Sequence, residues 1–226
     1  MMRTLEKARK YPESPKGRIL TAARRLFGKY GFRGTTTRMI ADEVGIDIST
    51  LHYHWGDKID LYDASVLDVS KDFRKMIIKV DKMICGLSLQ DRLSIFIDEM
   101  TDYLFKNPES SRLIMFRFFD QPSEGAILDL KIHEFVAEVA QSIGLVNDKR
   151  TISPYVQMMV IALMNSMHNF ISGENLFRPM INVSREGYIL SVKETLKFIH
   201  IPALIDGSGS SWDRIETNNV YESYAP

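Results

Sequence analysis

Apolar residues recur along most of this chain at intervals of three and four, the spacing that places them on one face of an α-helix. The first such pattern begins at Lys16 and ends at Gly31, a residue type that accepts the left-handed conformation common just past a helix. A second short helix is expected after the threonines 35–37 and ends at Gly45, and a third ends at Gly56. Three helices within about forty residues, the last two joined by a tight connection, are typical of a helix-turn-helix unit.

The pattern stays helical in the rest of the chain. A long helix is expected over residues 62–83, and further helices over residues 89–105, 109–119, 124–143, 151–172 and 183–200. There is no convincing run of period-two alternation and no internal repeat. The sequence therefore predicts an all-α fold of about nine helices, with a three-helix amino-terminal head and a helical carboxy-terminal body.

Local composition indicates where these parts begin and end. Residues 1–15 are polar and contain two prolines, which indicates a flexible arm. Residues 206–211 have the glycine and serine content of a linker, so a flexible tail is expected over residues 203–226. Between them we expect a helix-turn-helix domain over residues 16–60 and a second domain over residues 61–202.

The overall composition is that of a globular protein. Of 226 residues, 45% are hydrophobic, which is enough to bury a substantial core. The single cysteine cannot form an intrachain disulfide. Neither terminus carries an apolar run long enough to span a bilayer, and the amino terminus lacks the apolar core of a signal peptide. These features favour a cytoplasmic protein without a membrane partner.

Charge is unevenly distributed although the net charge is zero. Residues 1–58 hold 12 lysine and arginine residues against 6 aspartate and glutamate residues, and residues 59–226 hold 17 against 23. A basic module joined to an acidic one indicates that only the first meets a polyanion.

One stretch of the basic head carries a specific family likeness. It reads ILTAARRLFGKYGFRGTTTRMIADEVG over residues 19–45 and STLHYHWGDKIDL over residues 49–61. This stretch resembles the tetracycline-repressor family of bacterial transcription regulators. The resemblance implies a homodimer with two amino-terminal DNA-binding heads and a helical body that binds a small molecule and dimerises.

The third helix of the head has the residue types that a DNA-reading helix needs. Its spacing turns Leu51 and Trp55 toward the core and leaves hydrogen-bonding side chains facing outward. The threonines before the second helix can place hydroxyl and N–H groups against a phosphate, or serve only as helix caps. The candidate DNA-binding residues are Thr36, Thr37, Arg38, Ser49, Thr50, Tyr53, His54 and Lys58. In the family, positions matching Thr36, Thr50, Tyr53, His54 and Lys58 commonly contact DNA.

Three positions depart from the family pattern. Asp47 stands before the third helix, where its carboxylate would repel phosphate, so we expect it to cap that helix instead. His52 replaces a usual tyrosine and Trp55 a usual phenylalanine. His52 and His54 lie two apart on a helix, which points their rings in opposite directions, so we predict no metal site.

The 151–172 helix leaves almost no polar face, so it must be covered on every side. Together with the 183–200 helix it predicts a four-helix interface with a second copy of the chain. The alternative is a helix buried within a monomer. The candidate interface residues are Tyr155, Val156, Val160, Ile189, Val192, Leu196 and Ile199.

Methionine and aromatic residues in the body suggest an adaptable apolar cavity, although residues of this kind at helical spacing also form ordinary cores. Tyr103 and His168 are the expected polar groups in such a cavity. The candidate ligand-binding residues are Met100, Tyr103, Leu104, Met115, Phe116, Phe119, Met159, Met164 and His168.

Enzyme signatures are missing: the chain has no dinucleotide, phosphate-loop, nucleophile-elbow or zinc-protease motif, and no cofactor is predicted. The expected function is a repressor that binds a palindromic double-stranded DNA operator as a homodimer and is released by a small apolar or amphipathic effector. Two alternatives stay open. One is a DNA-binding dimer without a small-molecule effector, and the other is a helical enzyme or adaptor with a degenerate head.

Overall fold

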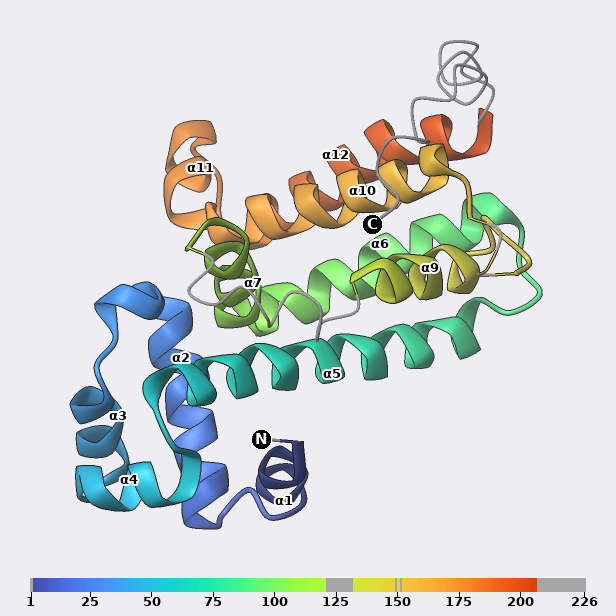
Figure 1. Ribbon diagram of the computed structural model, residues 1–226. Coiled ribbons are helices and arrows are strands. Elements are labelled where there is room, and N and C mark those ends of the chain that lie inside the picture. Colours follow the sequence, from blue (N-terminus) through green and yellow to red (C-terminus); the bar gives the residue numbers. More distant parts are fainter. Residues whose placement is uncertain (1, 121–131, 149, 151, 207–226) are drawn as a thin grey trace, which may run out of the picture.

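The computed structural model describes residues 2–120, 132–148, 150 and 152–206, and these residues form eleven helices with no strand among them (Figure 1). The expected all-α fold is therefore confirmed. The expected number of about nine helices is corrected, because α1 (Met2–Lys10) and α11 (Glu174–Ile181) are helices that the apolar pattern did not indicate.

Helix α1 replaces the flexible arm expected over residues 1–15. Its side chains Leu5 and Ala8 are buried, and they pack into the hydrophobic core together with helices of the head. Arg9 on the same helix forms ion pairs with two aspartates of the body. Only two apolar side chains anchor this helix, so its mostly polar sequence shows no apolar periodicity from which it could be predicted.

The head consists of α2 (Pro15–Gly34), α3 (Thr37–Val44) and α4 (Ile48–Trp55). Thr36 caps α3, since its hydroxyl accepts a hydrogen bond from the Met39 amide at 3.1 Å. Gly45 ends α3 with a φ of 74°, a left-handed conformation that favours glycine. The short connection that follows turns the chain into α4, which completes the predicted helix-turn-helix unit.

The body is built on a long helix that leaves the head. This helix, α5 (Lys58–Ile84), runs along the molecule, and α6 packs between it and α12 (Figure 1). Helices α10 and α12 lie side by side on the opposite edge from α5. Besides α5 and α11, the described helices of the body are α6 (Leu89–Lys106), α7 (Pro108–Asp120), α9 (Ile132–Ser142), α10 (Pro154–Ser172) and α12 (Arg185–Asp206).

Prolines mark the places where predicted helix ends differ from the observed ones. The last predicted helix stops before Pro202, whereas α12 continues through it to Asp206. Leu204 is buried in this last turn, and the hydroxyl of Tyr155 donates a hydrogen bond to the Ala203 carbonyl at 2.7 Å. These tertiary contacts offset the backbone hydrogen bond that proline cannot donate. The expected tail over residues 203–226 therefore begins within a helix, and residues 207–226 lie outside the described residues.

Helices α2 and α7 approach closely at Gly28. A Cβ atom at this position would lie 2.6 Å from the Glu109 carbonyl oxygen, and a backbone atom cannot move aside cheaply. We expect Gly28→Ala to lower the free energy of unfolding by about 1–2 kcal/mol, because an overpacking cost of up to about 3 kcal/mol exceeds the helix-propensity gain of at most about 1 kcal/mol.

Urea unfolding followed by circular dichroism measures this change. The matched control is Gly187→Ala in α12, where the nearest atom lies at an ordinary 3.4 Å. That variant should be as stable as the parent or slightly more so. An equal effect of the two substitutions would contradict a close helix contact at Gly28.

Candidate nucleic-acid interface and cavity

Helix α4 presents one face to the core of the head and the other to solvent. Leu51 and Trp55 are buried, as the spacing predicts, and the Trp55 indole donates a hydrogen bond to the Lys16 carbonyl at 3.2 Å. On the other side Ser49 is exposed and Thr50 is half-buried. The core contacts fix the rotation of α4 about its axis, and this rotation decides which side chains reach outward.

Tyr53 is the most prominent of these outward side chains, with 85% of its surface exposed. Its ring lies beside that of His54, with 5.1 Å between the ring centroids. Burial, and then the nearby Lys16 charge, lowers the pKa of His54 from its ordinary value, which favours the neutral imidazole. A neutral imidazole can both donate and accept hydrogen bonds, which suits contact with base edges or phosphates.

The start of α3 combines a cap with a positive charge. The hydroxyl of Thr36 is occupied by its capping hydrogen bond, so capping, which the sequence left as one alternative, does occur. Thr37 is half-buried in the first turn, and Arg38 is exposed beside it. Helix N-terminal amides together with an exposed arginine favour an anion at this end of α3.

Lys58 is half-buried, and Asp47 does not cap α4 as expected. The Lys58 ammonium lies 4.2 Å from the centre of the Phe32 ring, and partial burial lowers its pKa. Asp47 stands at the N-cap position of α4, but its side chain makes no capping hydrogen bond. Its backbone carbonyl instead accepts the Thr50 amide at 3.0 Å, which corrects the expected role of the carboxylate.

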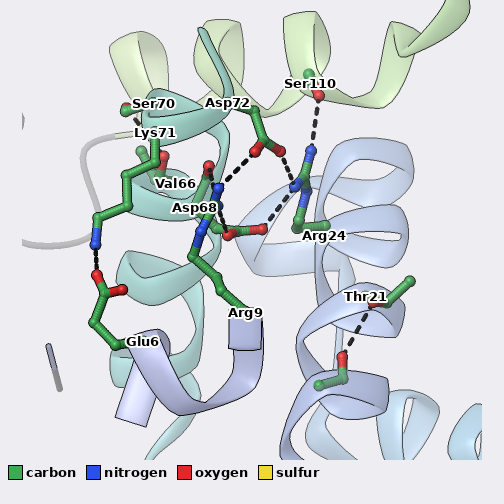
Figure 2. Close-up of polar contacts among 11 residues, drawn as sticks. Glu6, Arg9, Thr21, Arg24, Val66, Asp68, Ser70, Lys71, Asp72 and Ser110 are labelled. Carbon is green, nitrogen blue, oxygen red and sulfur yellow. Dashed lines mark hydrogen bonds and ion pairs between the residues drawn. The ribbon is translucent and has the colours of Figure 1, made fainter. Parts of the chain in front are cut away.

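A polar cluster joins the head to the body, and we call Arg9, Arg24, Asp68, Asp72 and Ser110 the junction cluster (Figure 2). Arg24 of α2 donates to Asp68 at 2.6 Å and to Asp72 at 2.7 Å, both on α5, and to Ser110 of α7 at 3.2 Å. Arg9 of α1 donates to both aspartates as well.

Asp72 of the junction cluster stays ionised. Burial alone would raise the pKa of Asp72, but hydrogen bonds and charge interactions with Arg24 and Arg9 outweigh it and lower that pKa. Arg24 of the head and Arg9 of α1 are therefore paired with carboxylates of the body and do not face a polyanion. The sequence does contain an indication of this cluster, because Asp68 and Asp72 lie four apart on one face of the long helix. The charge count alone does not reveal it.

The body contains a cavity of about 510 Å³ between α5, α7, α9 and α10, within the range of small-molecule sites. Four of the predicted ligand-binding residues lie on its wall, namely Met115, Phe119, Met164 and His168. Burial lowers the pKa of His168 to about 4, and its Nδ1 lies 3.1 Å from the Ser111 hydroxyl.

The other five predicted ligand-binding residues do not line this cavity. Met100 and Leu104 are fully buried in the core of α6. Tyr103 packs edge-on against Phe73, and burial raises its pKa to about 12. Phe116 and Met159 are half-buried away from the wall. These residues follow the same apolar periodicity as the cavity residues, and that periodicity does not distinguish core from cavity.

The wall also includes residues that the sequence interpretation did not select. Phe73 and Ser70 come from α5, and Arg117 comes from α7. Asn165 and Asn169 come from α10, where they flank His168 at helical spacing. The sequence feature that could have identified the α10 residues is a set of polar side chains at positions i, i+3 and i+4 of an otherwise apolar helix.

The predicted dimer residues divide into two groups. Val160, Val192 and Leu196 are buried within the single chain, so they are not available to a partner. Tyr155, Val156 and Ile189 are half-buried, and Ile199 is 53% exposed. Besides Ile199, the apolar side chains that α10 and α12 leave exposed are ones that were not predicted: Met158, Leu190, Phe198 and Ile205. The wholly apolar helix is thus covered largely by its own chain.

The described residues offer neither a metal site nor a membrane-spanning helix. In the part of the chain that the structure describes, no three histidine, cysteine or acidic side chains are grouped so that they would hold a metal ion. None of the described helices combines the length and the apolar character needed to cross a bilayer.

The comparisons with known proteins agree with this architecture. Residues 19–65 match the family model of bacterial regulatory proteins of the tetR family, which confirms the resemblance noted in the sequence. Regulators of this family bind DNA and are not enzymes. No curated protein matches the chain.

Solved structures are similar over most of the chain. A TetR-like transcriptional regulator from Rhodococcus sp. RHA1 is 17% identical with a TM-score of 0.59, over 83% of this chain and 94% of that one. A transcriptional regulator from the same source is 12% identical with a TM-score of 0.62, over 86% and 97%. A Clostridium perfringens protein named as a candidate fatty acid metabolism regulator is 14% identical with a TM-score of 0.60, over 84% and 97%. At these identities the likeness establishes the fold alone.

Proposed function

We propose that this chain, with its tetR-type head and the fold of transcriptional regulators, is a ligand-responsive repressor. It binds a palindromic operator as a homodimer and is released when a small apolar or amphipathic effector occupies the body cavity. The observation that carries the proposal is Tyr53, whose ring is held 85% exposed on α4 while Leu51 and Trp55 anchor the opposite face.

The dimensions of the head support DNA recognition. An α-helix with its side chains is about 10–12 Å across, so the major groove of B-DNA, about 12 Å wide, admits the eight-residue helix α4. We assign base or phosphate contacts on this helix to Ser49, Thr50, Tyr53 and His54. Thr37, Arg38 and Lys58 contact the flanking phosphates, and Thr36 orients the first turn of α3 through its cap.

Helix α5 provides the connection between effector and operator. It begins at Lys58, three residues after α4 ends, and it contributes Ser70 and Phe73 to the cavity wall. A ligand that displaces α5 therefore moves the head. In a dimer, heads that are no longer about 34–36 Å apart lose one of two half-sites.

The exposed apolar side chains of α10 and α12 are the surface we assign to the dimer. Phe198 is 82% exposed, and Met158, Leu190 and Ile199 are exposed on the same pair of helices. Two copies joined here form a four-helix interface. Interface size and partner orientation are then set by these residues and not by the buried Val160, Val192 and Leu196.

Tyr53→Ala is expected to lower DNA affinity about tenfold or more, because it removes a contact worth about 1–3 kcal/mol. Lys58→Ala should weaken binding to all sequences and reduce the slope of log affinity against log salt by about one. The measurement is gel retardation of duplexes selected from a random-sequence library, between 50 and 200 mM salt.

Tyr11→Ala is the matched control, since Tyr11 is also exposed but lies between α1 and α2. It should leave the affinity unchanged. If Tyr53→Ala and Lys58→Ala also left it unchanged, α4 would not be the DNA-reading helix and the proposed function would fail.

A further inference from the structure

The inner side of helix α1 is fixed to the rest of the chain at several points. Leu5 and Ala8 are buried in the core. Arg9 forms ion pairs with two aspartates of α5, and Glu6 forms one with Lys71 of the same helix (Figure 2). These contacts fix the rotation of α1 about its axis, and the rotation determines which of its side chains face away from the protein.

The outer side of α1 carries three positive charges. Arg3, Lys7 and Lys10 are exposed and lie at positions i, i+4 and i+7, which places them on one face of the helix. None of the three forms an ion pair with another described residue. We call these three side chains the α1 cationic face. Like charges at this spacing repel one another, so an anion bound on this face would be stabilising.

The α1 cationic face continues the surface that we assign to DNA. Helices α1 and α4 both pack against α2 and lie at the same end of the molecule, on either side of the start of α2 (Figure 1). Lys16 in the first turn of α2 accepts the Trp55 indole hydrogen bond, and its charge acts on His54 of α4. Only residues 11–14 connect α1 to α2. Residues 1–18 together hold six lysine and arginine residues against two glutamates, so positive charge extends from α4 to α1.

We infer that the α1 cationic face binds the phosphate backbone of DNA beside the base pairs that α4 reads. The inference rests on the proposed function, since it takes α4 as the reading helix. A duplex carries one negative charge per about 1.7 Å of its axis, so an exposed cationic face held to the side of α4 meets phosphates. Helix α1 precedes residues 19–65, the part that matches the family model, so this contact would enlarge the DNA-binding surface beyond the matched region.

The docking of α1 strengthens such a contact. A mobile arm of the same composition would lose conformational entropy when it becomes ordered on DNA. Helix α1 is already ordered by its buried side chains and by the ion pairs of Arg9. Its three cations therefore act together, and each contributes close to a full phosphate contact to the salt dependence of binding.

The first test replaces all three cations in one protein, which combines Arg3→Ala, Lys7→Ala and Lys10→Ala and is called the α1 variant. Gel retardation of the selected duplexes between 50 and 200 mM salt measures the slope of log affinity against log salt. Each phosphate contact contributes about 0.9 to this slope, so the slope should decrease by about 2.7 for each bound head. Affinity at 50 mM salt should fall about tenfold or more, and equally for selected and unrelated duplexes, because phosphates carry no sequence information.

The second test locates the contact through the length of the duplex. One duplex ends at the selected base pairs, and the other continues for about ten base pairs, one helical turn, at each end. The parent should bind the longer duplex about tenfold or more tightly, whereas the α1 variant should bind both equally. Equal binding of the two duplexes by the parent would overturn the inference, and this comparison decides even if the α1 variant does not fold.

The matched control combines Lys79→Ala, Lys82→Ala and Lys106→Ala, which remove the same charge from exposed positions of the body. It should retain the parental slope, and so should Tyr11→Ala, which removes no charge. A slope that decreases equally in the control and the α1 variant, or in neither, would overturn the inference but leave the proposed function intact. A parent protein that retards no duplex at all would refute the proposed function and the inference together.

Discussion

Asp68→Ala is expected to lower the free energy of unfolding by about 3 kcal/mol. Breaking a buried ion pair typically costs about 3–5 kcal/mol, because the remaining charge stays buried without its partner. The side chains of Arg9 and Arg24 keep 14% and 16% exposure, and Asp72 still contacts both, which favours the lower end of that range. Urea unfolding with matched m-values measures the change.

Asp68→Asn separates charge from shape in this experiment. The amide retains an acceptor oxygen but loses the negative charge, so it should recover only part of the lost stability. Glu43→Ala is the surface control, since its partner Arg25 is largely exposed and such pairs contribute little. If Asp68→Ala were no more destabilising than Glu43→Ala, the junction cluster would not hold the head to the body.

The stability of the protein is also expected to fall by about 3 kcal/mol between pH 6.5 and 4 through His168. Its pKa is lowered by burial from 6.5 to about 4 in the folded chain. Between these values the unfolded chain binds a proton that the folded chain does not, so the free energy of unfolding decreases as pH decreases. Each pH unit contributes about 1.4 kcal/mol, and below pH 4 this group adds no further dependence.

His168→Phe should remove this part of the pH dependence, because phenylalanine does not titrate and fills a similar volume. The measurement is the free energy of unfolding of both proteins at half-unit steps from pH 7.5 to 4. Parallel pH profiles of His168→Phe and the parent would show that this imidazole is accessible to water.

Local signals account for the features of the head that were predicted correctly. The helix of residues 37–44 is bounded by a threonine cap and a left-handed glycine, and both effects act within a few residues. The side chains of Leu51 and Trp55 are buried as predicted because they lie four apart, on one face of a short helix. Such features depend little on the rest of the fold.

Long-range contacts account for the features that were missed. Helix α1 packs through Leu5 and Ala8, and Arg9 finds aspartates about sixty residues away, where no local pattern relates them. In the body, Met100 and Met164 carry the same periodic signal, although the first is core and the second lines the cavity. Arg117 was passed over because a charged residue in sequence is ordinarily a surface residue.

The amino-acid sequence by itself determined that the chain is helical, where its head lies, and which side chains of α4 share a face. The tertiary structure alone decided that Val160 and Leu196 are interior, that α1 is docked, and that one arginine is enclosed beside an apolar cavity. The physical reason is that helical periodicity specifies which residues lie on a common face. What covers that face, whether another helix, a ligand or a second chain, depends on segments far away along the chain.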